Sequence, residues 1–202
     1  MENRTVIDAR KNMYLFLSDL YLFEVDQEKL QGLKALEFPM DIENEDLKEG
    51  YGKITSYLSR KEVSQDTLDE LAVDYARLFL SAGVASGKAA FPYESVYTSK
   101  QHMMMQEAGS NASANYGGKG LRPRKDMYQV PEDHLGLLLE FMARLCEEEK
   151  KEQSAFCKEH LDAWIPAFVQ DVMKYATTDF YQGLALVTRG FVAMEKEYLC
   201  NK

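Results

Sequence analysis

The sequence has few cysteines and lacks any long apolar run. Its three cysteines, Cys146, Cys157 and Cys200, are odd in number and lie inside helical patterns, so they fit reduced thiols better than a disulfide framework. No apolar stretch approaches the roughly 20 residues that a transmembrane helix needs. The first residues, 1–8, also lack the basic and then apolar layout of a signal peptide. We therefore expect a cytoplasmic protein without stable membrane insertion.

An excess of positive charge is also lacking. The chain has 24 Lys and Arg residues against 33 Asp and Glu residues, which gives a net charge of -9. Proteins whose main task is to bind nucleic acid carry a basic face that neutralises phosphates, so this class is excluded. An acidic surface suits a cationic partner instead.

Strand patterns are absent as well, because no segment alternates apolar and polar residues between turn dipeptides. Apolar residues recur instead at helical spacing, with Asp26, Asn44 and Ser64 as candidate N-caps. The spacing predicts helices over about 5–23, 26–36, 44–58, 64–81, 132–149, 151–160, 165–175 and 179–199, and a polar helical stretch that ends at Gly117. We predict an all-α fold, a single globular helical bundle of about eight to ten helices around a central helix.

The segment 131–149 is the predicted central helix. Its apolar residues sweep roughly 200° of the helix circumference, twice the stripe of an ordinary surface helix, so it should be covered from more than one side. Pro131 suits the first helical position, and Glu132 and Asp133 place negative charge at the positive end of the helix dipole. Glu140 and Arg144 occupy the narrow polar remainder.

Glycine and basic residues gather just before this helix, at 117–125. This composition is typical of a flexible linker. We expect one domain over residues 1–202, with a helical part at about 1–116, a linker at about 117–130 and a second helical part at about 131–202.

Catalytic motifs are scarce. Asp133 beside His134 could orient a general base, but adjacent helical residues do not face each other, so a helix start with a buried, hydrogen-bonded histidine is favoured. No nucleophile stands at a spacing that completes a triad. The segment 83–89 has neither the spacing nor the preceding strand of a phosphate-binding loop. We expect no catalytic residues and no cofactor.

A metal site is also disfavoured. Cys157 and His160 lie one helical turn apart, with Cys146 upstream. Closed zinc sites need four ligands and usually show paired Cys-x-x-Cys spacings, which are missing here. We expect no bound metal, and two helical residues near a chain reversal.

The loop 91–97 carries three aromatic residues and the acid Glu94. Exposed aromatic residues usually mark a binding surface. A loop packed down by its own side chains is the alternative, and the sequence favours neither.

Two motifs together, Pro92-Tyr-Glu-Ser-Val-Tyr97 and Pro131-Glu-Asp-His-Leu135, resemble the hallmarks of the redox-enzyme maturation chaperones of the TorD/DmsD type. The resemblance covers most of the chain. It implies an all-helical cytoplasmic chaperone, not an enzyme, that binds the twin-arginine signal peptide of a molybdenum-cofactor oxidoreductase and delays export until the cofactor is inserted. The implied partner is the catalytic subunit of a DMSO- or TMAO-reductase-like molybdoenzyme, with the chaperone a monomer or dimer.

The resemblance also implies a signal-peptide-binding region, formed by Phe79, Tyr93, Glu94, Ser95, Pro131, Asp133 and His134. Two guanidinium groups followed by an apolar segment require acids beside a hydrophobic groove, and this set contains both. Phe91 and Val130 depart from the family pattern, and Val130 replaces an acid that could pair with an arginine. A small hydrolase or nucleotide-binding protein using Asp133 and His134 is the alternative, and a plain helical adaptor is another.

Overall fold

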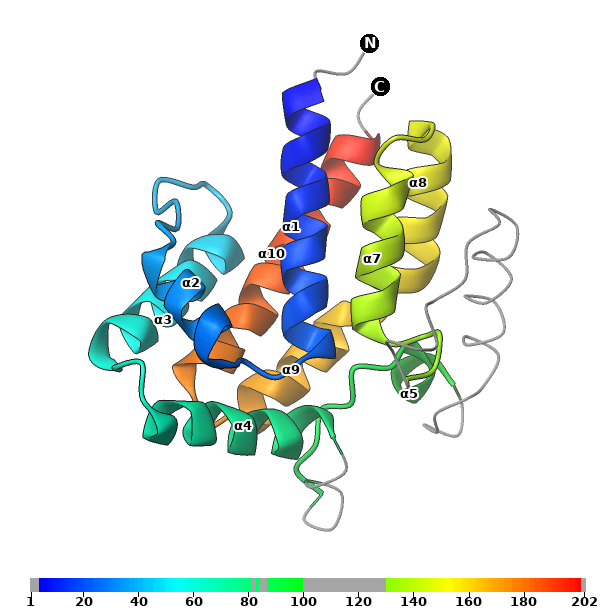
Figure 1. Ribbon diagram of the computed structural model, residues 1–202. Coiled ribbons are helices and arrows are strands. Elements are labelled where there is room, and N and C mark those ends of the chain that lie inside the picture. Colours follow the sequence, from blue (N-terminus) through cyan, green and yellow to red (C-terminus); the bar gives the residue numbers. More distant parts are fainter. Residues whose placement is uncertain (1–3, 81–82, 84–86, 100–129, 201–202) are drawn as a thin grey trace. The chain divides into compact units, whose positions relative to one another are not determined.

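Helices make up the regular structure of this computed structural model, which describes residues 4–80, 83, 87–99 and 130–200 (Figure 1). Within these ranges the helices are α1 (Arg4–Leu22), α2 (Gln27–Ala35), α3 (Glu45–Arg60), α4 (Gln65–Phe79), α5 (Glu94–Thr98), α7 (Leu135–Leu145), α8 (Lys150–Cys157), the π-helical turn η2 (Lys158–Asp162), α9 (Ile165–Tyr175) and α10 (Asp179–Cys200). No strand occurs in the described ranges, apart from one isolated bridge between Tyr93 and His134. The predicted all-α class is confirmed.

Three helices begin at the caps that the sequence indicates. The side chain of Asp26 accepts a hydrogen bond from the backbone N–H of Lys29 at 2.8 Å, and Asn44 caps α3 through Leu47 N–H at 3.0 Å. Ser64 caps α4 in the same way, though at a longer 3.4 Å. These short polar side chains satisfy N–H groups that have no partner inside the helix, which is why the helices start there.

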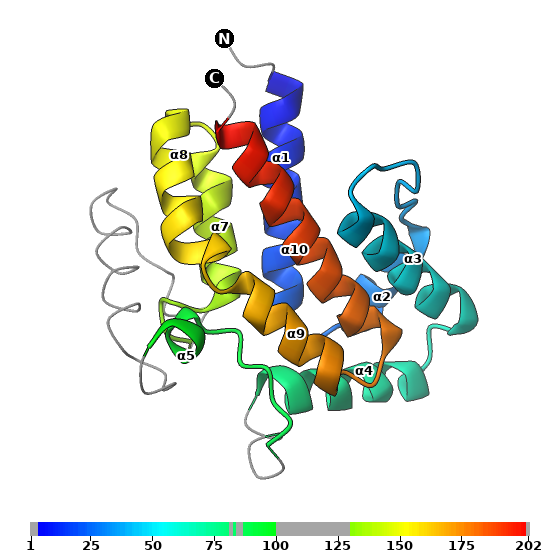
Figure 2. The ribbon, with the colours of Figure 1, turned by 180° about the vertical axis from the view of Figure 1, so that it is seen from behind.

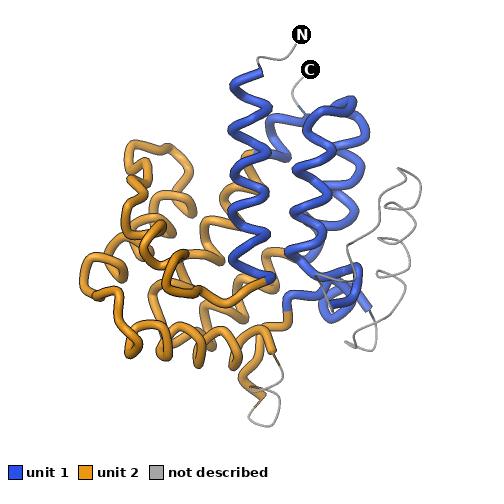
Figure 3. The backbone as a smooth tube through the Cα atoms, viewed as in Figure 1, with its two compact units in different colours: residues 1–22, 92–164, 195–202 blue, residues 23–91, 165–194 orange. Residues whose placement is uncertain are grey.

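The chain divides into two compact units (Figure 3). The first unit consists of residues 1–22, 92–164 and 195–202, and the second of 23–91 and 165–194. Both units combine segments from before and after the predicted linker at 117–130. That linker, except for Val130, lies outside the described residues, as does the helical stretch expected before Gly117. The division of the domain at this linker stays a prediction.

In the first unit, α7 lies beside both α1 and α8 (Figure 1 and Figure 2). Nearly every α7 side chain is buried, and only Glu140 and Arg144 reach solvent. The predicted covering of this helix from more than one side is therefore confirmed. A Cβ atom on Gly136 would lie 2.5 Å from Cγ of Leu22, so the absence of a side chain lets α1 approach closely. Ser18 Oγ reinforces the approach by donating to the carbonyl of Gly136 at 2.7 Å.

In the second unit, Asp74 of α4 holds the start of α10. Its carboxylate accepts hydrogen bonds from the backbone N–H groups of Thr177 and Thr178, from the Thr178 hydroxyl at 2.8 Å, and from Arg77. Asp74 is fully buried, so these donors supply the partners that a buried charge needs. The Thr178 Oγ in turn accepts from Tyr181 N–H at 3.4 Å, so it caps the start of α10.

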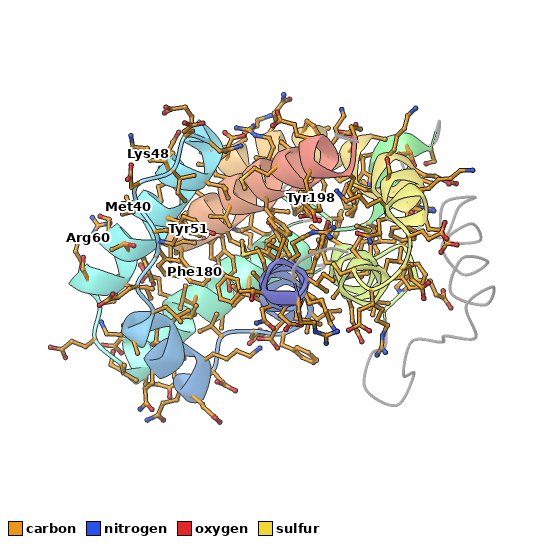
Figure 4. The ribbon with its side chains drawn as sticks, turned by 90° about the horizontal axis from the view of Figure 1, so that it is seen from above. Met40, Lys48, Tyr51, Arg60, Phe180 and Tyr198 are labelled. Atoms are coloured by element: carbon orange, nitrogen blue, oxygen red, sulfur yellow. The ribbon has the colours of Figure 1, made fainter. Side chains whose placement is uncertain are left out.

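Aromatic residues fill the core of the second unit. Phe79, Tyr75 and Tyr181 meet edge to face at ring distances of 5.3 and 5.5 Å, and Phe180 packs on Tyr181. Phe180 lies inside, whereas Arg60 points outward (Figure 4). Among the described helices, none combines the length and the apolar content that a membrane span requires.

Two helix ends differ from the prediction. Helix α7 ends at Leu145 rather than near Glu149, and a turn separates it from α8. The segment predicted as a helix to His160 is α-helical only to Cys157 and continues as the π-helical turn η2. Periodicity over a whole segment does not reveal where a helix ends or where a single short π turn begins.

Candidate functional site

The two sequence motifs lie side by side in the first unit and are joined through their backbones. Leu135 N–H donates to the carbonyl of Pro92 at 2.7 Å, and Glu94 N–H donates to the carbonyl of Asp133 at 3.1 Å. We call residues 92–95 and 131–135 the motif junction. The antiparallel bridge between Tyr93 and His134 lies at its centre.

Asp133 ties the motifs together with its side chain as well. Its Oδ2 accepts a hydrogen bond from Ser95 N–H at 3.0 Å, which places a carboxylate at the first turn of α5. Asp133 and Ser95 are fully buried. In the described part of the chain, Oδ1 of Asp133 and Oγ of Ser95 have no hydrogen-bond partner. A buried carboxylate oxygen without a donor is costly, so it offers an acceptor to a ligand that brings one.

His134 is buried and hydrogen-bonded at a helix start, as predicted, but the helix begins later than expected. Helix α7 begins at Leu135, and Pro131 is not its first residue: His134 N–H closes a turn on the Pro131 carbonyl at 3.1 Å. The bridge to Tyr93 requires extended backbone at His134, which becomes the N-cap and accepts from Gly136 N–H through Nδ1 at 3.1 Å. The expected helix start was therefore three to four residues too early.

The imidazole of His134 is neutral. Burial lowers its pKa to about 3, because the charged form would lose its hydration. Its ring meets that of Tyr93 edge to face, with centroids 5.0 Å apart. The side-chain hydrogen bonds of Asp133 and His134 go to Ser95 N–H and Gly136 N–H, not to each other. Each is committed to a backbone N–H group instead, so the arrangement does not form a carboxylate–imidazole pair for general-base chemistry.

Glu94 has a partner that the sequence analysis missed. Nδ1 of His160, in η2, lies 2.9 Å from Oε2 of Glu94, and both side chains are buried. Burial raises the pKa of the Glu94 carboxyl, and the hydrogen bond from His160 opposes this rise. The residues are 66 positions apart, so no local pattern links them. The one available signal was that an acid in a buried motif needs a donor, and the chain has only three histidines.

The other end of α5 is held by Trp164. Its ring stacks on that of Tyr97 with centroids 5.5 Å apart and planes inclined by 20°. Its Nε1 donates to the carbonyl of His160 at 2.7 Å. The segment that contains η2 thus supports the first motif at both Glu94 and Tyr97.

Six of the seven predicted site residues lie in the first unit. The motif junction brings together Tyr93, Glu94, Ser95, Asp133 and His134, with half-buried Pro131 at its edge. Phe79 belongs to the second unit, where it packs against Tyr75, Phe168 and Tyr181.

The aromatic loop is largely packed rather than exposed. Tyr93 retains 9% of its surface and Glu94 retains 5%, while Tyr97 is half-buried. The alternative of a segment packed down by its own side chains therefore describes the core of this motif. Only its flanks offer aromatic surface.

Among the cysteines, Cys146 and Cys157 are buried free thiols and Cys200 is an exposed one. Burial raises the pKa of the Cys157 thiol to about 12, which makes it a poor nucleophile. Within the described ranges, no three His, Cys, Asp or Glu residues cluster in a way that could hold a metal ion. His160, considered above as a ligand, faces Glu94 instead. Segment 83–89 is described only in part.

A groove of about 450 Å³ lies elsewhere in the first unit, between α1 and α7. Leu15 and Ala143 contribute apolar surface, and Glu140, Glu147 and Lys11 are among the charged residues that line it. Glu147 already pairs with Lys11 at 2.7 Å. None of the predicted site residues lines this groove.

Comparison with known proteins places these features in a family. A family model described as nitrate reductase delta subunit matches residues 43–170. A chaperone protein TorD from Vibrio vulnificus is 28% identical over 208 residues, which cover 95% of each chain. The chaperone protein TorD of Shewanella pealeana is also 28% identical, over 98% of this chain and 93% of its own.

A solved structure shares the fold. A candidate redox enzyme maturation protein from Archaeoglobus fulgidus superposes with a TM-score of 0.52, at 21% identity, over 94% of this chain and 93% of its own. The curated relatives are named as chaperones and not as enzymes. Because the family model spans more than half of the sequence, the chain belongs to the nitrate reductase delta subunit family, and the resemblance to TorD-type redox-enzyme maturation chaperones is confirmed.

Proposed function

We propose that this protein is a cytoplasmic chaperone that binds the twin-arginine signal peptide of a molybdenum-cofactor oxidoreductase. In this role it assists cofactor insertion and delays export until the enzyme is mature. The client is the catalytic subunit of a DMSO- or TMAO-reductase-like enzyme. The chaperone name of the relatives and the family membership support the general role, and the motif junction supports the signal-peptide ligand.

The proposal rests on the hydrogen bonding of the two carboxylates at the junction. Asp133 and Glu94 each have one oxygen held by a protein donor, Ser95 N–H in one case and His160 in the other. The second oxygen of Asp133 has no hydrogen-bond partner among the described residues, and the contact with His160 engages only Oε2 of Glu94. Two guanidinium groups supply donors for two such oxygens, and charge-assisted hydrogen bonds of this kind are the strong ones.

The electrostatics favour a cation at the junction. Burial raises the pKa of Glu94, and the negative charge of Asp133 adds to the rise. A guanidinium placed between the two carboxylates offsets their mutual repulsion and replaces lost hydration. Because both acids are buried in the free chain, binding includes a local opening of the junction.

Apolar surface borders the same acids. Pro131 and Tyr93 belong to the junction, and Pro131 is half-buried, as are Val130 and Tyr97, which flank the junction in the sequence. An apolar segment that follows the paired arginines gains from covering such side chains, since burial of apolar area favours association.

Calorimetry tests the proposal directly. The ligand is a synthetic signal peptide, with paired arginines and an apolar core, from a reductase encoded beside this protein. The control ligand is the same peptide with both arginines replaced by lysines. Lysine keeps the positive charge but cannot form the bidentate hydrogen bonds of arginine. We expect the arginine peptide to bind about tenfold more tightly, which corresponds to about 1.4 kcal/mol. Equal affinities contradict recognition of the arginines by these acids.

A further inference from the structure

His160 is tightly enclosed in the first unit. It lies in η2, its ring centroid is 4.6 Å from that of Phe156, and its carbonyl accepts from Trp164 Nε1. No surface of the residue is exposed. Its ring nitrogens face two acids: Nδ1 is 2.9 Å from Glu94 Oε2, and Nε2 is 3.7 Å from Glu159 Oε1. The imidazole therefore has a fixed direction.

The π-helical geometry of η2 helps to set this direction. A π turn accommodates an extra residue, so residues after it are rotated relative to a continued α-helix, and such turns occur often at functional sites. The turn ends just before Trp164, which stacks on Tyr97. One short segment thus holds both ends of α5, through His160 on Glu94 and Trp164 on Tyr97.

The contact orients the carboxylate of Glu94. Nδ1 engages Oε2, so Oε1 is the oxygen of Glu94 that this contact leaves available. We propose that His160 is a positioning residue of the signal-peptide site, which holds Oε2 of Glu94 so that Oε1 accepts from an arginine guanidinium. This inference rests on the proposed function and adds to it the residue that prepares Glu94.

Loss of the imidazole N–H has a definite consequence. Glu94 is buried, so a carboxylate without its internal donor takes up a proton or turns toward another donor. In either case the acceptor geometry that distinguishes a planar guanidinium from an ammonium is lost, whereas apolar contacts with the peptide are kept. Loss of the imidazole should therefore lower the ratio of the arginine-peptide affinity to the lysine-peptide affinity. The affinity for the lysine peptide itself should change less.

The test measures the ratio of the two peptide affinities in three variants. His160→Leu removes the donor, and His160→Gln moves it to the Nε2 side of the ring. His160→Asn keeps an N–H close to the Nδ1 position. We expect the ratio to fall about tenfold in the first two variants and to be largely restored in the third, at unchanged helicity. If the His160→Leu protein does not fold, the affinity ratio of the His160→Gln protein provides the test.

A double variant separates positioning from general stability. With Glu94→Gln in the background, His160→Gln is expected to lower the ratio no further, because both changes act on the same oxygen. Wild-type protein with no preference for the arginine peptide contradicts the proposed function itself. A wild-type preference that survives unchanged in His160→Gln and His160→Leu overturns the role of His160 and leaves the proposed function standing.

Discussion

Nη2 of Arg10 lies 2.7 Å from Oε2 of Glu195, and only 6% and 5% of the two side chains are exposed. Tyr14 donates to the same Oε2 at 2.8 Å, and Gln153 accepts from Arg10 at 2.6 Å. These residues come from α1, α8 and the last turns of α10. The network thus joins distant segments of the chain inside the first unit.

Breaking this ion pair from one side should destabilise the protein strongly. Glu195→Gln leaves the guanidinium of Arg10 buried without its carboxylate, and we expect a loss of about 3–5 kcal/mol in the free energy of unfolding, measured by urea denaturation. The matched control is Asp162→Asn, which breaks the partly exposed pair with Lys196 and should leave the urea midpoint nearly unchanged. Similar midpoints for the two variants contradict a special role of the buried pair.

The free energy of unfolding should decrease as the pH is lowered, because of His134. Burial lowers its pKa from the ordinary 6.5 to about 3, so between these values the unfolded chain binds a proton that the folded chain does not. The stabilisation is complete above pH 6.5 and is lost as pH falls toward 3, with a slope that approaches about 1.4 kcal/mol per pH unit.

The variant His134→Asn isolates this contribution. Asparagine keeps an acceptor for Gly136 N–H at the N-cap but does not titrate. Denaturation at pH 7 and pH 5 should therefore show a smaller loss in the variant than in the wild type. An equal loss in both proteins assigns the acid sensitivity to other groups.

Two glycines of α3 should respond oppositely to alanine. A Cβ atom on Gly50 would lie 2.8 Å from both the carbonyl oxygen of Gly183 and the backbone nitrogen of Val187, whereas on Gly52 the nearest atom is Cε of Met40 at 3.7 Å. Gly50→Ala should cost about 1–3 kcal/mol through steric overlap. Gly52→Ala should gain up to about 1 kcal/mol from helix propensity. Thermal unfolding of the pair is the measurement, and equal melting temperatures contradict the close approach of α3 and α10.

Neutralising Asp133 should weaken peptide binding. In Asp133→Asn the amide oxygen still accepts from Ser95 N–H, but the charge-assisted contact with arginine is lost, so we expect about 1–3 kcal/mol weaker binding of the arginine peptide. The matched control is Asp41→Asn, which makes the same change of charge at an exposed position. Affinities for the arginine peptide are measured by calorimetry. Equal affinities of the two variants would show that the arginine site lies elsewhere.

The sequence by itself determined the local features of this protein. Caps such as Asn44 act within three residues, so their pattern is sufficient to locate a helix start. The apolar arc of α7 likewise predicted its burial, because a helix with so little polar face has no stable exposed arrangement. The all-α class followed from the same periodicity.

Tertiary structure alone decided the details of the candidate site. The start of α7 moved to Leu135 because His134 pairs with the backbone of Tyr93, a contact between residues 41 positions apart that overrides local helix propensity. Glu94 meets His160, which lies in the π-helical turn η2, across 66 positions of the chain. Such long-range partners satisfy buried charged and polar groups. Their interaction energy depends on the distance between the groups in space, which no local sequence pattern specifies.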